Sequence, residues 1–201
     1  MDIILATRNP SKAEQIRAVF PSPTFNILML DEVGVIGDAV EDGTTLYENA
    51  QKKVLFAKGQ VAKPYWIMAE DTGLFITALG GKPGIHAARW AGDDATTEEI
   101  LEYTLSKLAG KTDRTATFET VVVLISPEGQ ELTFSGKAPG VLLESPRMKP
   151  QPKMPYSAIF VPDGSSKTWA EMTVHEENLI SHRGKAFTQV IQFLETKLAE
   201  G

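Results

Sequence analysis

Residues 2–20, with the sequence DIILATRNPSKAEQIRAVF, constrain the fold more than any other stretch of the chain. They begin with a short apolar run, Ile3 to Leu5, which is typical of a buried parallel strand. Pro10 follows at the first position of a predicted helix, where proline is tolerated. Behind it, apolar residues recur at helical spacing at Ala13, Ile16, Val19 and Phe20. A strand that passes through a short turn into an amphipathic helix predicts an α/β protein.

The turn between this strand and helix is rich in cations and short polar side chains, namely Thr7, Arg8, Asn9, Ser11 and Lys12. A helix N-terminus presents unpaired backbone N–H groups and a partial positive charge, so the turn is a candidate phosphate site. The chain carries neither GxxxxGK[ST] nor GxGxxG at this turn. A capped helix with a solvated turn is therefore the alternative interpretation.

The remainder of the chain alternates between strand and helix patterns. Strands are predicted at 25–30, 65–69, 115–126, 131–135, 140–143 and 156–161, and helices from Thr45 to Pro64, from 96 or 97 to 108, and after Ser181. The proline-rich stretch at 146–155 is predicted to be a loop. Strand–helix units combined with a hairpin around 127–130 predict an α/β fold with a mixed sheet, in a single domain over residues 1–201.

Composition narrows the possible partners. The net charge of −6 argues against a nucleic-acid polymer, although a local basic pocket for a small anion is compatible with it. The chain has no cysteine, which fits a reducing compartment. No charged-then-apolar leader and no apolar run of membrane-spanning length are visible. We therefore expect a cytoplasmic protein without a membrane partner.

Acidic residues gather at three places that the fold could bring together. Glu41 lies before a glycine, Glu48 lies one turn into the second helix, and Asp71 follows Glu70 at the end of a predicted strand. Carboxylates from these places would suit Mg²⁺, which takes oxygen ligands and binds beside substrate phosphates. The alternative for Glu48 is the capping box that begins at Thr45, and the alternative for Asp71 is a turn or cap.

Basic residues gather separately, at Arg8, Lys12, Lys52, Lys53 and the pair His182-Arg183. Arg183 would lie in the first turn of the last helix, where a cation opposes the helix dipole unless an anion or acceptor lies nearby. The alternatives are an exposed arginine and a histidine that only caps or packs.

Six ordered motifs together resemble the inosine triphosphate pyrophosphatase family. They are ATRNPSKAEQI, EDGTTLYENAQKK, AEDTGL, LGGKPGIHAARWAG, KTWAEMT and ISHRGKAF, and they cover the chain from Ile4 to about Leu194. The resemblance implies Mg²⁺-dependent hydrolysis of non-standard purine nucleoside triphosphates (ITP, dITP and XTP) to the monophosphate and pyrophosphate. It also implies an elongated α/β fold of two lobes around a long mixed sheet, with the nucleotide in the cleft between them. Members of the family are usually homodimers.

The resemblance also implies roles for individual residues. Asp71 matches the acid that holds Mg²⁺ and acts as general base, and Glu41 and Glu48 match acidic positions near the metal. The positions matched to substrate binding are Thr7, Arg8, Asn9, Lys12, Lys53, Thr72, Tyr156, His182 and Arg183. Of these, Asn9 and Lys12 would face the phosphates, and His182 and Arg183 would recognise the purine 6-oxo group, since donors favour a keto group over the amino group of adenine.

The sequence departs from the family pattern around the base. In MKPQPKMPYSAIF, residues 148–160, Met154 stands where the family has a stacking phenylalanine, and Pro155, Ser157 and Ala158 replace glycine, aspartate and proline. Glu177 replaces a lysine, and Glu70 stands where an aspartate is usual. Three hypotheses follow: a pyrophosphatase for non-standard purine triphosphates, a pyrophosphatase with a shifted base preference, and a nucleotide-binding protein with little turnover.

Overall fold

The computed structural model describes residues 1–200, which form one mixed sheet covered by helices. The strands are β1 (Asp2–Leu5), β2 (Asn26–Met29), β3 (Trp66–Ile76), β4 (Pro83–Gly84), β5 (Thr115–Ile125), β6 (Glu131–Leu142) and β7 (Phe160–Pro162). The helices are α1 (Pro10–Val19), α2 (Leu46–Lys58), α3 (Thr97–Lys107), α4 (Val174–Ile180) and α5 (His182–Glu200). The predicted α/β class with a mixed sheet is confirmed.

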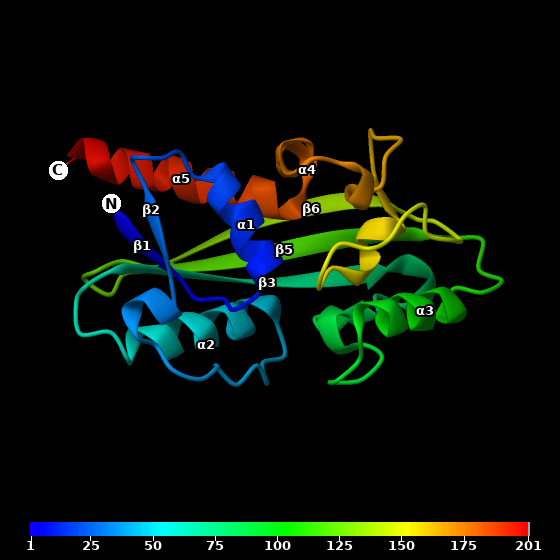
Figure 1. Ribbon diagram of the computed structural model, residues 1–201, viewed down its shortest axis with the longest axis horizontal. Helices are drawn as coiled ribbons and strands as arrows, with labels where there is room; N and C mark the ends of the chain where they lie inside the picture. The colour runs from blue at the N-terminus through cyan, green and yellow to red at the C-terminus, as the bar shows by residue number, and fades with distance from the viewer. Residues whose placement is uncertain (201) are drawn as a thin grey trace.

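The sheet has the spatial order β2-β1-β3-β5-β6-β7, with β4 paired to β3. Strand β1 runs parallel to both β2 and β3, whereas the pairs β3–β5, β5–β6 and β6–β7 are antiparallel. The long strands β3, β5 and β6 extend along the whole molecule, and both chain termini lie toward one end of it (Figure 1).

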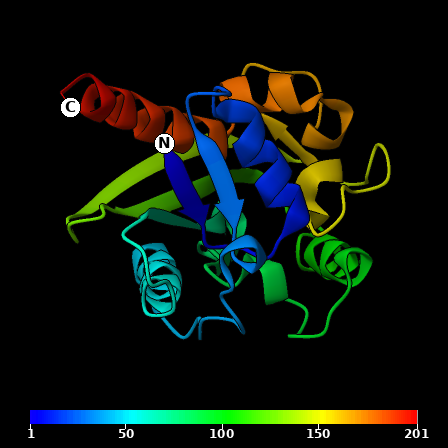
Figure 2. The same ribbon diagram turned by 60° about the vertical axis from the view of Figure 1, so that its left-hand side comes forward.

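Helices cover both faces of this sheet. Helices α2 and α3 lie on one face, and α1, α4 and α5 lie on the other (Figure 1). Turning the molecule shows α1 crossing beside the short strands β1 and β2 (Figure 2). Among residues 1–200, no helix combines the length and apolar character that crossing a bilayer requires.

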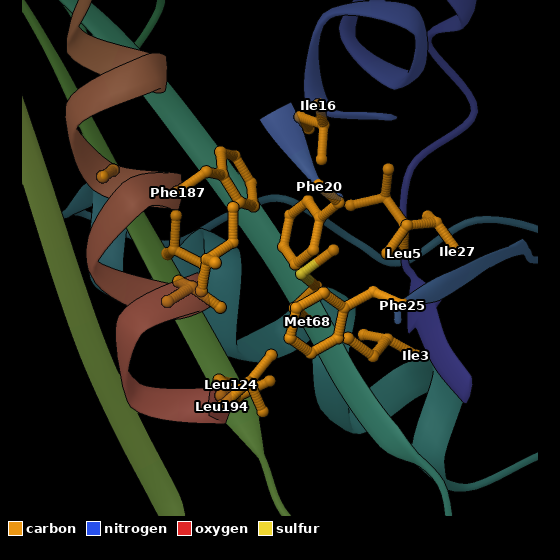
Figure 3. Close-up of a cluster of buried hydrophobic side chains, with 14 of the residues drawn as sticks. Ile3, Leu5, Ile16, Phe20, Phe25, Ile27, Met68, Leu124, Phe187 and Leu194 are labelled. Carbon is orange, nitrogen blue, oxygen red and sulfur yellow. The ribbon is translucent and has the colours of Figure 1, made fainter. Parts of the chain in front are cut away.

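The buried hydrophobic side chains form three clusters. The first lies between the sheet and helices α1 and α5, where Phe20 packs edge-on against Phe25 and Phe187 and Met68 lies beneath them (Figure 3). The second includes Val54 and other residues of α2 on the opposite face. The third lies toward α3, around Phe118, Phe160 and Trp169. Burial of these side chains from both faces fixes the position of β3, which carries most of the candidate site.

Side-chain caps set the helix starts that the sequence predicted. Asn9 accepts hydrogen bonds from the N–H groups of Ser11 and Lys12 and so begins α1 at Pro10. Thr45 caps α2, and Thr96 with Glu99 forms a complete capping box at α3. These polar residues satisfy N–H groups that have no partner inside the helix.

Three predicted elements differ in extent or kind from the structure. The predicted strands 131–135 and 140–143 form one strand, β6. Gly136 and Gly140 interrupt the sequence pattern, but both permit close approach instead, because an added Cβ would meet the carbonyl oxygens of His182 and Val161 respectively. The predicted strand 156–161 is a 3₁₀ turn, Pro155–Ala158, followed by β7. The predicted strand 65–69 is the first half of β3, which continues through Ile76.

Candidate functional site

The candidate site lies where β1 ends and β3 continues. Strand β1 pairs with β3 only from Trp66 to Met68, and β4 pairs with it only at Leu74 and Phe75. Within residues 1–200, the segment 69–73 therefore has no strand beside it on this edge. The turn before α1 and the acidic pair of β3 meet at this position.

Strand alternation separates the two acids of β3. Successive side chains of a strand point to opposite faces, so Glu70 and Thr72 share one face and Asp71 occupies the other. Asp71 contacts α2, whereas Glu70 contacts α1 and α5. The two neighbouring carboxylates thus belong to two different clusters.

The first cluster joins Asp71 to α2 through Lys53. The Lys53 ammonium lies 3.1 Å from Asp71 Oδ1 and 2.9 Å from Glu41 Oε2, and it donates to the Glu70 carbonyl oxygen at 3.2 Å. Asn49 donates to Asp71 Oδ2 at 3.2 Å. Lys53 and Asn49 are four residues apart and share one face of α2. As the sequence analysis expected, Glu41 and Asp71 lie close together, and the Lys53 ammonium contacts both carboxylates.

In this cluster, burial and the neighbouring opposite charges shift the pKa values of Asp71 and Lys53 in opposite directions. Burial raises the pKa of the Asp71 carboxyl, although Lys53 and Lys12 act to lower it. Burial acts to lower the pKa of Lys53, but Asp71 and Glu41 outweigh it and hold that pKa above its ordinary value. Asp71 is therefore a carboxyl group that accepts a proton more readily than an exposed aspartate.

The donor atoms here fit Mg²⁺. Glu41 and Asp71 already converge on a single cation, the Lys53 ammonium. Mg²⁺ commonly binds through one or two carboxylates and completes its shell with phosphates and water. The described residues contain no group of three metal-binding side chains. Glu41 and Asp71 are thus the two carboxylates here that could hold the ion beside the substrate phosphates.

Two residues singled out in the sequence have their side chains engaged elsewhere. Glu48 accepts hydrogen bonds from the backbone N–H of Thr44, at 2.6 Å, and from the Thr44 hydroxyl, so the full capping box at Thr45 that the sequence offered as an alternative does not form. Arg8 pairs with Asp31 and Asp38 and donates to the carbonyls of Val35 and Gly37, so it fastens the loop after β2. That Glu48 binds metal and that Arg8 binds substrate stay predictions.

The second cluster surrounds Glu70. Its carboxylate lies 2.5 Å from the Lys12 ammonium and 3.7 Å from the Arg183 guanidinium, and it accepts a hydrogen bond from Thr72 at 2.5 Å. Arg183 also donates to Gln15 of α1 at 2.5 Å. Burial acts to raise the pKa of Glu70, but Lys12 and Arg183 prevail and hold it well below its usual range. Glu70 thus supplies the nearby negative charge that offsets the unfavourable position of the Arg183 cation in the first turn of α5.

An aromatic cavity adjoins this cluster. His182 stacks on Phe118 with ring centroids 4.9 Å apart, and Trp169 lies 4.9 Å from the same imidazole. Tyr156 packs edge-on against Phe118, and its hydroxyl donates to the Ala87 carbonyl at 2.8 Å. Both ring nitrogens of His182 are buried without a hydrogen-bond partner. The cavity therefore offers aromatic surface together with unpaired polar atoms.

The loop 148–158 closes one side of this cavity. Met154 lies in its wall, and its sulfur accepts a hydrogen bond from Gln15 at 3.7 Å. Ser157 hydroxyl accepts from the Gln151 N–H and donates to the Met154 carbonyl, so it holds the loop closed on itself. The hydroxyl of Ser11 in α1 donates to the Pro152 carbonyl. A thioether, rather than an aromatic ring, thus forms this wall.

The two clusters open into adjoining cavities. The aromatic cavity is the smaller of the two, and the larger cavity lies beside Asp71 and Lys53. Lys12, Thr72 and Lys153 line both. A ligand could therefore place an apolar ring in one cavity and an anionic chain in the other, with Lys12 at the junction.

The sequence analysis missed several residues of this site. Gln15, Asn49, Phe118, Lys153 and Trp169 contact the clusters or line the cavities. A signal was available for Asn49, because it precedes Lys53 by one helical turn on the face of α2 that meets β3. Phe118 and Trp169 are distant in sequence, and only the sheet and the packing around it bring them to His182.

The buried histidine predicts a pH dependence of stability. Burial, together with the Arg183 charge, lowers the pKa of His182 well below its ordinary value of 6.5. As the pH falls below 6.5, the unfolded chain binds a proton that the folded chain does not, so the free energy of unfolding decreases by about 1.4 kcal/mol per pH unit until the folded-state pKa is reached. We expect His182→Phe to remove this loss while keeping the stacked ring. Chemical denaturation of both proteins at pH 7.0 and 5.5 measures the difference, and equal pH slopes would contradict the expectation.

Comparisons with known proteins show the family of the chain and solved structures with the same fold. The model of the Ham1 family matches residues 3–193. A dITP/XTP pyrophosphatase of Desulfotalea psychrophila is 36% identical over 98% of this chain and 90% of its own, and one of Leuconostoc mesenteroides is 39% identical over 94% of each chain. The structures of the Ham1 proteins of Staphylococcus aureus and Coxiella burnetii each superpose with a TM-score of 0.83, at 30% and 32% identity over 98% of this chain.

Proposed function

The chain belongs to the Ham1 family, and on this basis we propose that it hydrolyses non-standard purine nucleoside triphosphates, ITP, dITP and XTP, to the monophosphate and pyrophosphate. The observation that carries the proposal is the pair of adjoining cavities, one aromatic and one lined by carboxylates and cations. Such a pair suits a molecule with an apolar base and a polyanionic tail.

In this proposal the triphosphate lies over the turn before α1 and the unpaired edge of β3. Asn9 and Lys12 face this space from α1, Thr7 precedes them, and Lys53 borders it from α2. The N-terminus of α1 adds a partial positive charge. Lys12 and Thr72 lie at the junction of the cavities, where the phosphate chain would leave the sugar.

Asp71 is the proposed general base. Its raised pKa suits it to take the proton of a water molecule as that water attacks the anhydride between the α- and β-phosphates. Asn49 and Lys53 hold its two carboxylate oxygens and so orient it. Glu41 and Asp71 would hold Mg²⁺, which supplies positive charge to the phosphates when it is bound. The bond to pyrophosphate breaks as the monophosphate gains the water oxygen.

The aromatic cavity is the proposed base site. The neutral imidazole of His182 and the guanidinium of Arg183 would recognise the 6-oxo group, for which adenine presents an amino donor instead. Phe118, Trp169 and Tyr156 supply apolar surface for the ring. Because Met154 replaces an aromatic platform, we expect weaker stacking on the base than an aromatic side chain would give, which is worth about 1–3 kcal/mol per base.

We also propose that the enzyme works as a homodimer in the cytoplasm. The family resemblance supports the dimer, and the substrates are members of the cytoplasmic nucleotide pool. Sedimentation of the purified chain distinguishes a dimer of 201-residue subunits from a monomer.

A substrate panel tests the activity. With Mg²⁺ present, pyrophosphate release should be measurable with ITP, dITP and XTP and at least 10-fold slower in kcat/KM with ATP, since one mismatched polar contact in the base site costs about that much or more. Addition of excess EDTA should abolish the release. Hydrolysis of ATP at the rate of ITP would contradict the base assignment, and tight ITP binding without pyrophosphate release would support the nucleotide-binding alternative.

A further inference from the structure

Lys153 lies at the junction of the two cavities, and the proposed reaction gives it no role. It lines both cavities, as Lys12 and Thr72 do. Its side chain comes from the loop 148–158 and not from the sheet or from one of the helices α1 to α5. A cation at this junction borders the space in which a ligand that spans both cavities would join its ring to its anionic chain.

A tight turn carries Lys153. The Met154 N–H donates to the Gln151 carbonyl at 3.0 Å, so residues 151–154 form a β-turn with Pro152 and Lys153 at its centre. Proline fixes the first central φ at about −65°. The second central residue, Lys153, has a φ of +57°. This combination is that of a type II turn, whose second central position is normally occupied by glycine or asparagine.

The backbone conformation at this position is unfavourable for a lysine. Among residues 1–200, Lys153 is the one residue other than glycine that has a positive φ. In this region of φ the Cβ atom lies too close to the following carbonyl oxygen, and glycine or asparagine would form the same turn at a lower cost. A costly backbone conformation beside a cavity suggests that the side chain it carries has a function.

The turn is fixed against α1. The hydroxyl of Ser11, in the first turn of α1, donates to the Pro152 carbonyl at 2.8 Å. The Ser157 hydroxyl accepts from the Gln151 N–H at 2.9 Å and donates to the Met154 carbonyl at 2.8 Å, so both ends of the turn are held. The lysine of this turn is therefore carried beside the N-terminus of α1, where the proposed phosphate space begins.

The charge of Lys153 is not committed to a carboxylate of the protein. Three lysines line the cavities, namely Lys12, Lys53 and Lys153. Lys12 pairs with the buried carboxylate of Glu70, and Lys53 pairs with both carboxylates of the first cluster. None of the ion pairs formed by residues 1–200 includes Lys153, whose side chain is exposed. An incoming phosphate would therefore not compete with a carboxylate for this ammonium.

We propose that Lys153 is a substrate-binding residue that holds the α-phosphate of the nucleotide, at the place where the phosphate chain leaves the sugar. The inference rests on the proposed function, since it assumes a nucleotide that spans both cavities. A lysine ammonium binds phosphate as a point charge with three donors that can rotate toward the oxygens. The α-phosphate stays on the monophosphate product, so Lys153 binds substrate and product alike.

Titration calorimetry with IMP tests the proposal without turnover, because IMP carries the α-phosphate alone. Lys153→Asn removes the charge and introduces a residue that tolerates a positive φ. We expect it to weaken IMP affinity about 10-fold at low salt, as the loss of one charge-assisted hydrogen bond predicts. Lys153→Arg keeps the charge and should stay within about threefold of the parent.

Salt and a second lysine provide the controls. The difference between the parent and Lys153→Asn should shrink in about 1 M salt, where the screening length falls to about 3 Å. Lys149→Asn is the matched control, because Lys149 is an exposed lysine of the same loop that lines neither cavity. Its replacement should leave IMP affinity within about twofold of the parent, since distant exposed charges are largely screened.

The outcomes separate this inference from the proposed function. Equal IMP affinities of the parent and Lys153→Asn, or a parent that does not bind IMP, would overturn the role of Lys153, while ITP hydrolysis by the parent would still support the proposed function. An equal loss in Lys153→Arg, or a loss that high salt does not reduce, would also overturn it, because the turn and not the charge would then be responsible. A salt-sensitive loss confined to Lys153→Asn, in a protein that releases no pyrophosphate from any triphosphate, would overturn the proposed function and support the role of Lys153.

Discussion

Asp71→Asn should reduce the turnover of ITP by about 10²-fold or more, because loss of a general base that also holds the metal removes both contributions at once. The amide can still accept a hydrogen bond from Lys53, so the folded structure should persist. The Lys53 ammonium keeps Glu41 as a carboxylate partner at 2.9 Å, so the loss of stability should be smaller than for an ion left without a partner. Steady-state kinetics of ITP hydrolysis and thermal melting of the same preparations measure the two effects.

Asp42→Asn is the matched control for this experiment. Asp42 is an exposed aspartate that pairs with Lys52 of α2, and neither residue lines the two cavities. Its replacement should leave turnover within about twofold, since exposed ion pairs contribute at most about 1 kcal/mol and touch no substrate here. If Asp71→Asn retained a rate within a few-fold of the parent, Asp71 would be neither the base nor an essential metal ligand.

Lys12→Met should destabilise the folded protein, because the Lys12 ammonium pairs with a buried carboxylate besides facing the phosphates. Glu70 is buried, and its closest cation is the Lys12 ammonium at 2.5 Å. Removing one partner of a buried ion pair costs about 3–5 kcal/mol, because the remaining charge stays desolvated. Arg183 still faces Glu70 at 3.7 Å, and the Lys12 side chain is 21% exposed, so we expect a smaller loss of about 2–3 kcal/mol. Urea denaturation measures it.

The double variant Lys12→Met with Glu70→Gln resolves the origin of that loss. Removing both charges eliminates the uncompensated anion, so the double variant should recover more than half of the lost stability. Nucleotide affinity should not recover, since the cation at the junction of the two cavities is still absent. Equal destabilisation in the single and double variants would mean that Lys12 contributes through packing of its aliphatic stem and not through its charge.

Local patterns in the sequence determined where the principal helices begin and which class of fold they build. Pro10 behind Asn9, the cap at Thr45 and the cap at Thr96 each act within one helical turn, so their outcome depended little on the rest of the chain. The ordered motifs likewise identified the family, because they record side-chain types at fixed positions. Most of the residues they singled out, Asn9, Lys12, Lys53, Asp71, Thr72, Tyr156, His182 and Arg183, lie at the two adjoining cavities.

Helix α4 shows the limit of such local patterns. Its capping box, Thr173 with Glu176, is present in the sequence, but the segment has only seven residues and no predicted apolar stripe. Short helices derive their stability from packing rather than from propensity. The packing of α4 against α5, where Gly184 permits close approach, therefore helps to stabilise this short helix, in which Glu177 is buried.

Only the tertiary structure decided which charged side chains form ion pairs with one another. Alternation along β3 sends Glu70 toward Lys12 and Arg183 and Asp71 toward Lys53, but the sequence cannot say which helix covers which face. Arg8 shares a turn with Lys12, yet it pairs with the loop after β2. Spacing along a chain sets local geometry, whereas long-range ion pairs depend on how layers pack. The sequence alone determined the helix starts, the fold class and the family, and the packing of α1, α2 and α5 on the sheet decided the partner of each charge in the site.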